Sequence, residues 1–394
     1  MRNGLALCER ENRRVGRLSH RIDVVRPERL ERARREGRKT VALIGIDLPE
    51  ELFWACGAVP ISVGSFATPT AADEALPRDA CAVVRTGFDL LAHHWIPAGL
   101  IDAVVAASGC DWAARLGDRL EGRVPVWVLN TSRAAATSDP AALVHSRRAS
   151  LAAMLKALEV LTDMPLTRKA FDAAHQRMTS LRGLCDRLNR LRATIPPTVC
   201  ASEYYATAGA LDLADPARWA AAAEAFLADA RMPQQTGSAD PRVILSGCPA
   251  GFPDTSIVDL IEEAGLDIVG DDFTFHGDGR WIQSPPRGGR RAILDGLADA
   301  LVCDGAGDLP MKRGQRQANS LSCDGIIRLH YRGCAVGAME LTWLSPAFSD
   351  RGEKVLEIEV EQIGAAPEAT RTRLEAFRER LTARDAGCQP VKTL

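Results

Sequence analysis

The stretch Asp102–Asp111, with the sequence DAVVAASGCD, decides how we interpret this chain. Its first six residues form a short apolar run, which is typical of a strand buried on both faces of a parallel sheet. A glycine and a cysteine follow closely, and glycine permits the tight backbone turn that ends such a strand. Gly325–Cys334, with the sequence GIIRLHYRGC, has the same order of apolar run, glycine and cysteine. We therefore predict two α/β units, each with a cysteine at the end of one strand.

Further apolar runs surround these two stretches and alternate with helical patterns. Such alternation predicts a parallel sheet with helices on both faces. We expect strands at 40–46, 59–63, 102–107 and 124–129 in the first half of the chain, and at 242–246, 267–270, 325–330 and 355–360 in the second. The predicted fold class is α/β, with two flavodoxin-like or Rossmann-like parallel-sheet domains that resemble a loose duplication.

The spacing of leucines divides the chain further. Residues 136–235 are rich in Ala, Leu and Arg at helical spacing, which predicts a helical block between the two sheets. Residues 1–39 carry thirteen Arg and Lys side chains and are interpreted either as an amphipathic surface helix or as a docking arm for an acidic partner. We therefore predict an N-terminal helical arm at 1–39, a first α/β domain at 40–135, a helical block at 136–235 and a second α/β domain at 236–394.

Composition and motifs exclude several classes of protein. The 394 residues include 49 basic and 51 acidic side chains, so no net positive field attracts nucleic acid or an anionic membrane. No run of about 18 apolar residues predicts a transmembrane helix. The sequence has no G-x-S-x-G, Walker or G-x-G-x-x-G motif, which argues against an α/β-hydrolase, an ATPase and a dinucleotide-binding domain. No secretory signal opens it, so we expect a cytoplasmic protein.

Eleven cysteines are the unusual feature of the composition. In a reducing cytoplasm their thiols are expected to be free, metal-bound or catalytic. Cys110 and Cys334 follow predicted strands, and ligands of open α/β sheets collect at the carboxyl ends of strands. Cys81 precedes a helix expected at 82–93, whose N-terminus favours the thiolate that binds metal. No C-x-x-C pair occurs, and a buried structural thiol is the commoner role for each cysteine taken alone.

The other candidate ligands carry weaker signals. Cys248 also follows a predicted strand and is the best additional candidate. His93, His94 and His276 are possible metal ligands without a supporting pattern. We interpret the remaining cysteines as bystanders; they are Cys8, Cys56, Cys185, Cys200, Cys303, Cys323 and Cys388.

Six short motifs occur in one order between about residues 40 and 385. They are Leu48–Leu52 leading to Ala55–Pro60, Cys81 with Val84 and Arg85, Ser108–Asp111, Arg242–Pro249 with Ile261, Glu262 and Gly265, Asp324–Ile327 followed by Cys334, and Thr370–Phe377. In this order they resemble the 2-hydroxyacyl-CoA dehydratase and benzoyl-CoA reductase family of iron–sulfur subunits, of the 2-hydroxyglutaryl-CoA dehydratase D-component type. Each motif is short, and their common order makes the resemblance specific.

The resemblance implies a [4Fe–4S] cluster held by Cys81, Cys110 and Cys334 between the two α/β domains, with one iron open to water or a substrate oxygen. It implies that one low-potential electron passes to an acyl-CoA thioester. In dehydratases this electron makes a ketyl radical anion that expels a hydroxyl group, and in reductases it starts the reduction of an aromatic ring. The implied partners are a paralogous iron–sulfur subunit in a heterodimer and a separate ATP-dependent activator. Glu50 and Glu51 are candidate acid/base residues, and stabilising the helix start is their alternative role.

Two departures from the family pattern keep other functions open. Asp271–Phe275 lacks a cysteine that family members often carry, and Ala335–Leu341 differs from the usual continuation after the last ligand. One alternative is a double-cubane-type reductase of small molecules, which would need further ligands such as Cys248, Cys303 or Cys323. The other is a non-catalytic electron-transfer or assembly partner that keeps the fold.

Overall fold

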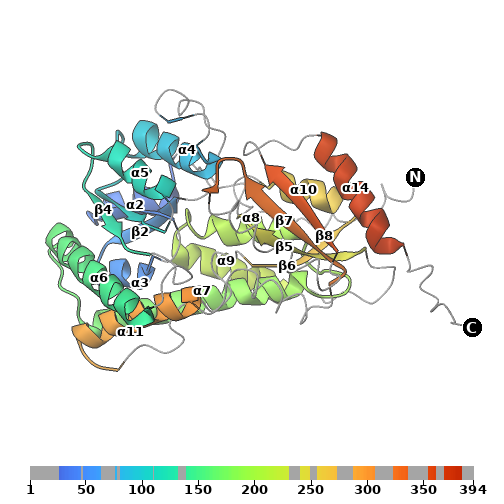
Figure 1. Ribbon diagram of the computed structural model, residues 1–394. Helices are drawn as coiled ribbons and strands as arrows, with labels where there is room; N and C mark the ends of the chain where they lie inside the picture. The colour runs from blue at the N-terminus through green and yellow to red at the C-terminus, as the bar shows by residue number, and fades with distance from the viewer. Residues whose placement is uncertain are drawn as a thin grey trace, which may run out of the picture.

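Two four-stranded, all-parallel sheets lie on either side of a block of helices, which confirms the predicted fold class (Figure 1). The computed structural model describes residues 26–45, 48–63, 76–77, 80–109, 111–131, 139–229, 240–248, 255–272, 287–306, 323–335, 354–360 and 368–383. In these ranges, no helix is both long enough and apolar enough to span a membrane. The predicted domain boundaries stay predictions.

The first sheet has the strand order β2-β1-β3-β4. Its strands are β1 (Thr40–Ile44), β2 (Val59–Val63), β3 (Ala103–Ala107) and β4 (Val126–Leu129). Every residue of β1 and β3 is buried, as expected for central strands with helices on both faces. The carboxyl ends of β1 and β3 flank the point where the strand order reverses, which is where open α/β sheets bind ligands.

The second sheet repeats this topology in the order β6-β5-β7-β8. Its strands are β5 (Arg242–Gly247), β6 (Asp267–Asp271), β7 (Gly325–Tyr331) and β8 (Val355–Val360). In this sheet β5 and β7 take the places that β1 and β3 take in the first. The shared order supports the loose duplication, and it places a second reversal point at the carboxyl ends of β5 and β7.

Helices cover both sheets and connect them. Around the first sheet lie α2 (Glu28–Arg35), α3 (Glu50–Ala55), α4 (Ala82–Asp89), the π-helix η2 (Leu90–Trp95) and α5 (Asp111–Leu120). The central block contains α6 (Pro140–Thr162), α7 (Arg168–Arg192), α8 (Ala201–Ala210) and α9 (Pro216–Asp229). Later in the chain come α10 (Ser256–Glu263), α11 (Arg290–Ala306) and α14 (Glu368–Thr382). Of the predicted N-terminal arm, the structure describes only residues 26–39, where Arg29 of α2 is buried and donates to the carbonyl of Pro60.

Helix α11 crosses from the second half of the chain to the first. Its side chains Ile293 and Leu297 belong to the same hydrophobic cluster as Val41 of the first sheet. Two ion pairs hold it against α6: Arg148 Nη1 lies 3.1 Å from Asp295 Oδ1, and Arg290 Nη1 lies 2.7 Å from Glu159 Oε1. Figure 1 shows α11 beside α6, far from the second sheet. The sequence pattern predicted a helix there but not that it packs on the other unit.

A buried ion pair joins the helical block to the second sheet. Arg192, the last residue of α7, is fully buried, and its Nη2 lies 2.7 Å from Asp271 Oδ2 at the end of β6. Tyr205 of α8 donates its hydroxyl to the same carboxylate oxygen at 2.8 Å. The guanidinium also binds Asn189 Oδ1 and lies over the ring of Tyr204 at 4.4 Å. A buried charge needs such partners, because an unpaired one would be expelled or neutralised.

Replacing Arg192 with leucine should destabilise the protein strongly. The change leaves Asp271 buried without its cation, and removing one partner of a buried pair costs about 3–5 kcal/mol. The exposed neighbour Arg190 is the matched control, since Arg190→Leu at a surface position should change the free energy of unfolding by less than about 0.5 kcal/mol. Urea unfolding followed by circular dichroism measures both. Equal losses for the two variants would contradict the anchoring role of Arg192.

Candidate metal centre

Cys81 lies at the N-cap position of α4, and its side chain is buried. Side-chain hydrogen bonding with Cys334, followed by burial, raises the pKa of the Cys81 thiol, while the amides of Val83 and Val84 in the first turn lower it. Amides at a helix N-terminus favour negative charge on sulfur. Cys81 therefore faces a second thiol from the other α/β unit, at a helix start that favours a thiolate.

The second thiol comes from the turn after β7. Gly333 has a φ of +77° in this turn, a left-handed conformation that favours glycine. The N–H of Cys334 then donates to the carbonyl of Tyr331 at 3.0 Å. Cys334 is half-buried and packs against the hydrophobic cluster that contains Cys81. The structure thus brings together two of the three predicted ligands, although 253 residues separate them in sequence.

A third thiol, that of Cys248, lies beside Cys334. Cys248 is buried directly after β5. Side-chain hydrogen bonding with Cys334 and then burial raise the pKa of its thiol well above the ordinary value, and the charge of Cys81 acts in the same direction. The sequence pointed to Cys248 only as an additional candidate, on the single signal that it follows a strand. Cys334 therefore stands between two other thiols.

Trp112 connects the first α/β unit to the thiols of the second. Its indole Nε1 donates to the carbonyl of Gly333 at 3.0 Å, one residue before Cys334. Trp112 belongs to the first turn of α5, which begins at Asp111. Across the turn before α5, the N–H of Gly109 donates to Thr131 Oγ1 at 2.8 Å. The bond from Trp112 therefore connects the start of α5 in the first unit to the turn that carries Cys334.

The remaining predicted site residues are less informative. Cys110 lies outside the described residues. Glu51 is buried in α3, where its Oε1 lies 2.6 Å from Arg182 Nη1 of α7. Glu50 is the first residue of the same helix. An acid/base role for Glu50 or Glu51 stays a prediction.

Three of the cysteines that we predicted to be bystanders are described by the structure and lie in other helices or turns than Cys81, Cys248 and Cys334. Cys56 and Cys185 are buried, Cys200 is half-buried, and burial is the main reason why the pKa of each thiol is raised, to about 12 for Cys56. Cys323 is half-buried before β7. Cys8, Cys388, His276 and the side chain of Cys303 lie outside the described part of the chain. His94 Nε2 lies 3.9 Å from Asp89 Oδ2.

The thiols of Cys81, Cys248 and Cys334 suit an iron–sulfur cluster better than a single metal ion. In the described ranges, no group of three or more His, Cys, Asp or Glu side chains is arranged to hold one metal ion. A [4Fe–4S] cluster makes a different demand, because each thiolate binds its own iron and the ligands surround the cluster. Three neighbouring thiols on turns and a helix start provide soft donors of the kind that such clusters require. The residues present therefore fit the group that the sequence resemblance implies.

A buried carboxyl group supports the turn that carries Cys248. Asp272 follows β6, accepts the hydroxyl of Ser246 at 2.5 Å and accepts the N–H of Gly247 at 3.0 Å. Burial raises the pKa of Asp272 to about 7, although these two hydrogen bonds act against the shift. The sequence pattern does not predict this contact, because Asp272 lies 24 residues after Cys248.

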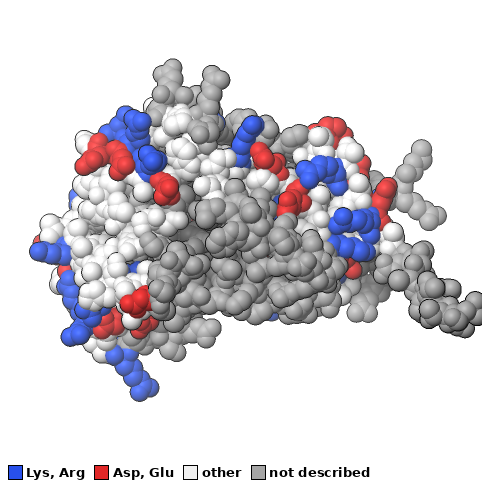
Figure 2. Space-filling model, in the orientation of Figure 1, with Lys and Arg blue, Asp and Glu red and all other residues white. Residues whose placement is uncertain are grey.

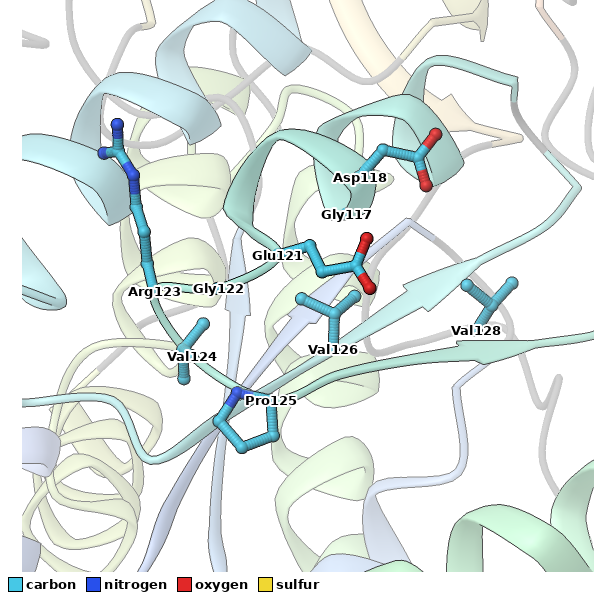
Figure 3. Close-up of a pocket in the computed structure, with 9 residues that line it drawn as sticks. All are labelled: Gly117, Asp118, Glu121, Gly122, Arg123, Val124, Pro125, Val126 and Val128. Carbon is cyan, nitrogen blue, oxygen red and sulfur yellow. The ribbon is translucent and has the colours of Figure 1, made fainter.

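A surface groove in the described part of the chain lies away from these thiols. It has a volume of about 510 Å³ and runs between the end of α5 and the edge strand β4, where Glu121 and Val126 face it (Figure 3). Val128 of the same edge is 52% exposed. The groove reaches the amino end of β4 at Pro125, whereas the thiol-bearing turns follow the carboxyl ends of other strands. It is thus not part of the thiol site.

Comparison with known proteins identifies the family. Residues 46–381 match the family described as 2-hydroxyglutaryl-CoA dehydratase, D-component. The chain belongs to this family. A relative from Escherichia coli (strain K12), named "Putative dehydratase subunit YjiM", is 24% identical over 306 residues, which make up 74% of this chain and 78% of the relative.

Membership of the D-component family confirms the resemblance and makes the chain a dehydratase-family subunit, in line with a lyase-type enzyme. Solved structures add little. The metal-bound protein FpvC from Pseudomonas aeruginosa, solved with Mn²⁺ and with Ni²⁺, is 15% identical to this chain in both cases. The alignments cover 87% of this chain and 96% and 94% of FpvC, with TM-scores of 0.23 and 0.20, too low to support any inference.

Asp272→Asn should change how stability depends on pH. In the unfolded chain an aspartate loses its proton near pH 4, whereas in the fold Asp272 keeps it up to about pH 7. The folded state binds more protons in this window, so the carboxyl group lowers stability as the pH rises from about 4 to 7. Asparagine does not titrate, and D272N should gain up to about 4 kcal/mol relative to wild type across the window.

Urea unfolding at pH 5, 6, 7 and 8 measures this difference. Asp118→Asn is the control, because Asp118 is exposed on α5 and should give a pH-independent offset. A difference between D272N and wild type that stays constant with pH would contradict the raised pKa.

Proposed function

We propose that the chain is a cytoplasmic [4Fe–4S] subunit of a 2-hydroxyacyl-CoA dehydratase. The observation that carries the proposal is the meeting of Cys81 and Cys334 in a member of the D-component family. The two thiols come from different α/β units and were expected to be ligands before their positions were known. A packing role alone gives no reason for Cys81 at the N-terminus of α4 to meet Cys334 just after the carboxyl end of β7.

The raised pKa values of the Cys81 and Cys248 thiols support binding of a group with positive charge. Mutual interaction and burial keep Cys81 and Cys248 protonated when nothing is bound. Iron removes this constraint, because a coordinating thiol is deprotonated outright. We assign Cys81 and Cys334 as ligands and propose Cys110, which precedes α5, as a third. The amides of Val83 and Val84 then stabilise charge on the Cys81 sulfur.

When bound, the cluster supplies a single low-potential electron for an acyl-CoA thioester. The residues of this chain hold the group in place and limit the access of water. Cys81 and Cys248 are buried in the hydrophobic cluster that extends from the first sheet into the second. The hydrogen bond from Trp112 to Gly333 joins the two units next to Cys334. Glu50 and Glu51 are the carboxylates that we propose for proton transfer, and Glu51 also pairs with Arg182.

The proposed function also requires other chains. We propose a paralogous iron–sulfur subunit as the companion in a heterodimer and a separate ATP-dependent activator as the electron donor. The electron that enters from the activator is passed to the thioester and is recovered after the hydroxyl group leaves, so dehydration is redox-neutral overall. The E. coli relative is named as a dehydratase subunit, which supports the dehydratase over the ring reductase.

Iron content tests the proposal. Protein purified or reconstituted without oxygen should be brown and contain about four irons per chain. Cys81→Ala and Cys334→Ala should each lose most of the iron and the visible absorption. Cys185→Ala is the matched control, because Cys185 is also buried but lies in α7, where burial is the main cause of the raised pKa of its thiol.

Three outcomes would count against the proposal. A colourless, iron-free wild type after reconstitution would refute it. About eight irons per chain would favour the double-cubane alternative. A normal cluster without acyl-CoA turnover, in the presence of activator and companion subunit, would favour the electron-transfer or assembly role.

A further inference from the structure

Both polar groups of the peptide bond between Gly333 and Cys334 are hydrogen-bonded. The N–H of Cys334 donates to the carbonyl of Tyr331 at 3.0 Å, within the second α/β unit. The carbonyl of Gly333 accepts the indole Nε1–H of Trp112 at 3.0 Å, from the first unit. A peptide bond is planar, so its N–H and its C=O can only turn together. The two hydrogen bonds therefore fix the orientation of this plane and restrict the direction in which the Cβ of Cys334 leaves the backbone.

The turn gains from a contact outside itself because its own backbone is permissive. Gly333 has a φ of +77°, and glycine loses more conformational freedom on folding than any other residue. Up to Arg332 the sheet holds the chain, since the N–H of Arg332 donates to the carbonyl of Val360 in β8 at 3.0 Å. Beyond Arg332, the contact from Trp112 holds the turn against the first unit.

Trp112 is itself held in place by the first sheet. It belongs to α5, where Leu116 is fully buried. A Cβ at Gly117 of this helix would lie only 3.0 Å from Val126 Cγ1 in β4, so α5 lies close against the sheet. The donor that reaches Gly333 is therefore carried by a helix with little room to shift.

We propose that Trp112 is a positioning residue for Cys334. Its N–H holds the Gly333–Cys334 peptide against the first unit, to which Cys81 belongs, and so keeps the Cys334 thiol in place for the cluster. This inference rests on the proposed function, from which it takes the cluster and the role of Cys334 as a ligand. Losing a hydrogen bond that orients a metal ligand typically costs about 10–100-fold in metal affinity. A packing role is the alternative, because the indole is large and half-buried.

Two substitutions separate the N–H group of the indole from its bulk. Trp112→Phe keeps most of the aromatic surface and removes the donor. Trp112→His removes the six-membered ring but keeps a donor, because histidine Nε2 lies as many bonds from the backbone as tryptophan Nε1. At pH 8 the imidazole is neutral and resembles the indole in charge. A positioning role makes Trp112→Phe the more harmful change, whereas a packing role makes Trp112→His the more harmful one.

Alkylation of the iron-free protein measures the position of Cys334 without any cluster. Iodoacetamide at pH 8 is the probe, and mass spectrometry compares Cys334 with the half-buried Cys200 in the same sample. We expect Trp112→Phe to accelerate alkylation of Cys334 several-fold, and Trp112→His to restore a rate near that of wild type. Trp54→Phe is the matched control, because Trp54 is also half-buried and its buried Nε1 has no hydrogen-bond partner among the described residues.

Iron release tests the same order in the loaded protein. After reconstitution without oxygen, transfer of iron to a ferrous chelator should be about 10–100-fold faster for Trp112→Phe than for wild type. Trp112→His and Trp54→Phe should stay near wild type. Circular dichroism of each variant reports whether the fold is kept.

Two results would overturn the positioning role of Trp112. One is a Trp112→Phe variant with the alkylation and iron-release rates of wild type. The other is an effect of Trp112→His that equals or exceeds the effect of Trp112→Phe. If wild type takes up no iron, the proposed function fails, while the order of the alkylation rates still decides whether Trp112 positions Cys334.

Discussion

The buried ion pair between Arg192 and Asp271 is the contact on which the thiol site depends. It joins the end of α7 to the carboxyl end of β6, and neither group is accessible to solvent. The next residue, Asp272, accepts hydrogen bonds from Ser246 and Gly247, directly before Cys248. A continuous run of polar contacts therefore leads from the helical block to a thiol. Because buried polar groups tolerate few alternative partners, this run defines where the second sheet lies on the block.

Contacts from the first α/β unit complete the site. Trp112 donates to the carbonyl of Gly333, and α4 presents Cys81 to Cys334. In Figure 1, α4 extends from the first sheet toward the end of β7. The charged side chains visible on this side of the molecule are scattered in both signs (Figure 2). Among the described residues, the two units meet through the hydrogen bond from Trp112 and through packing around Cys81 and Cys334.

The sequence predicted local structure well and long-range contacts poorly. The strands at 59–63 and 355–360 have the bounds that their apolar or alternating patterns indicated, because strand formation here follows from burial of adjacent residues. The placement of α11 on α6 and the pairing of Glu51 with Arg182 could not be predicted, because both join segments more than 100 residues apart. The contact between Cys248 and Cys334 could not be predicted for the same reason. The neighbour of Cys248, Gly247, was a usable signal, since a glycine between a buried strand and a cysteine also precedes Cys110 and Cys334.

The position of the thiols between the two units links stability to the bound group. Cys81 belongs to the first unit, whereas Cys248 and Cys334 belong to the second, so any group that binds all three connects parts of the chain that are otherwise joined mainly by packing. Binding to the folded state alone stabilises that state in proportion to affinity and free concentration. The contact with Cys334 and burial raise the pKa of the Cys81 and Cys248 thiols, and a bound metal would replace their protons. A cluster at this place would therefore act both as a redox centre and as the tightest link between the two sheets.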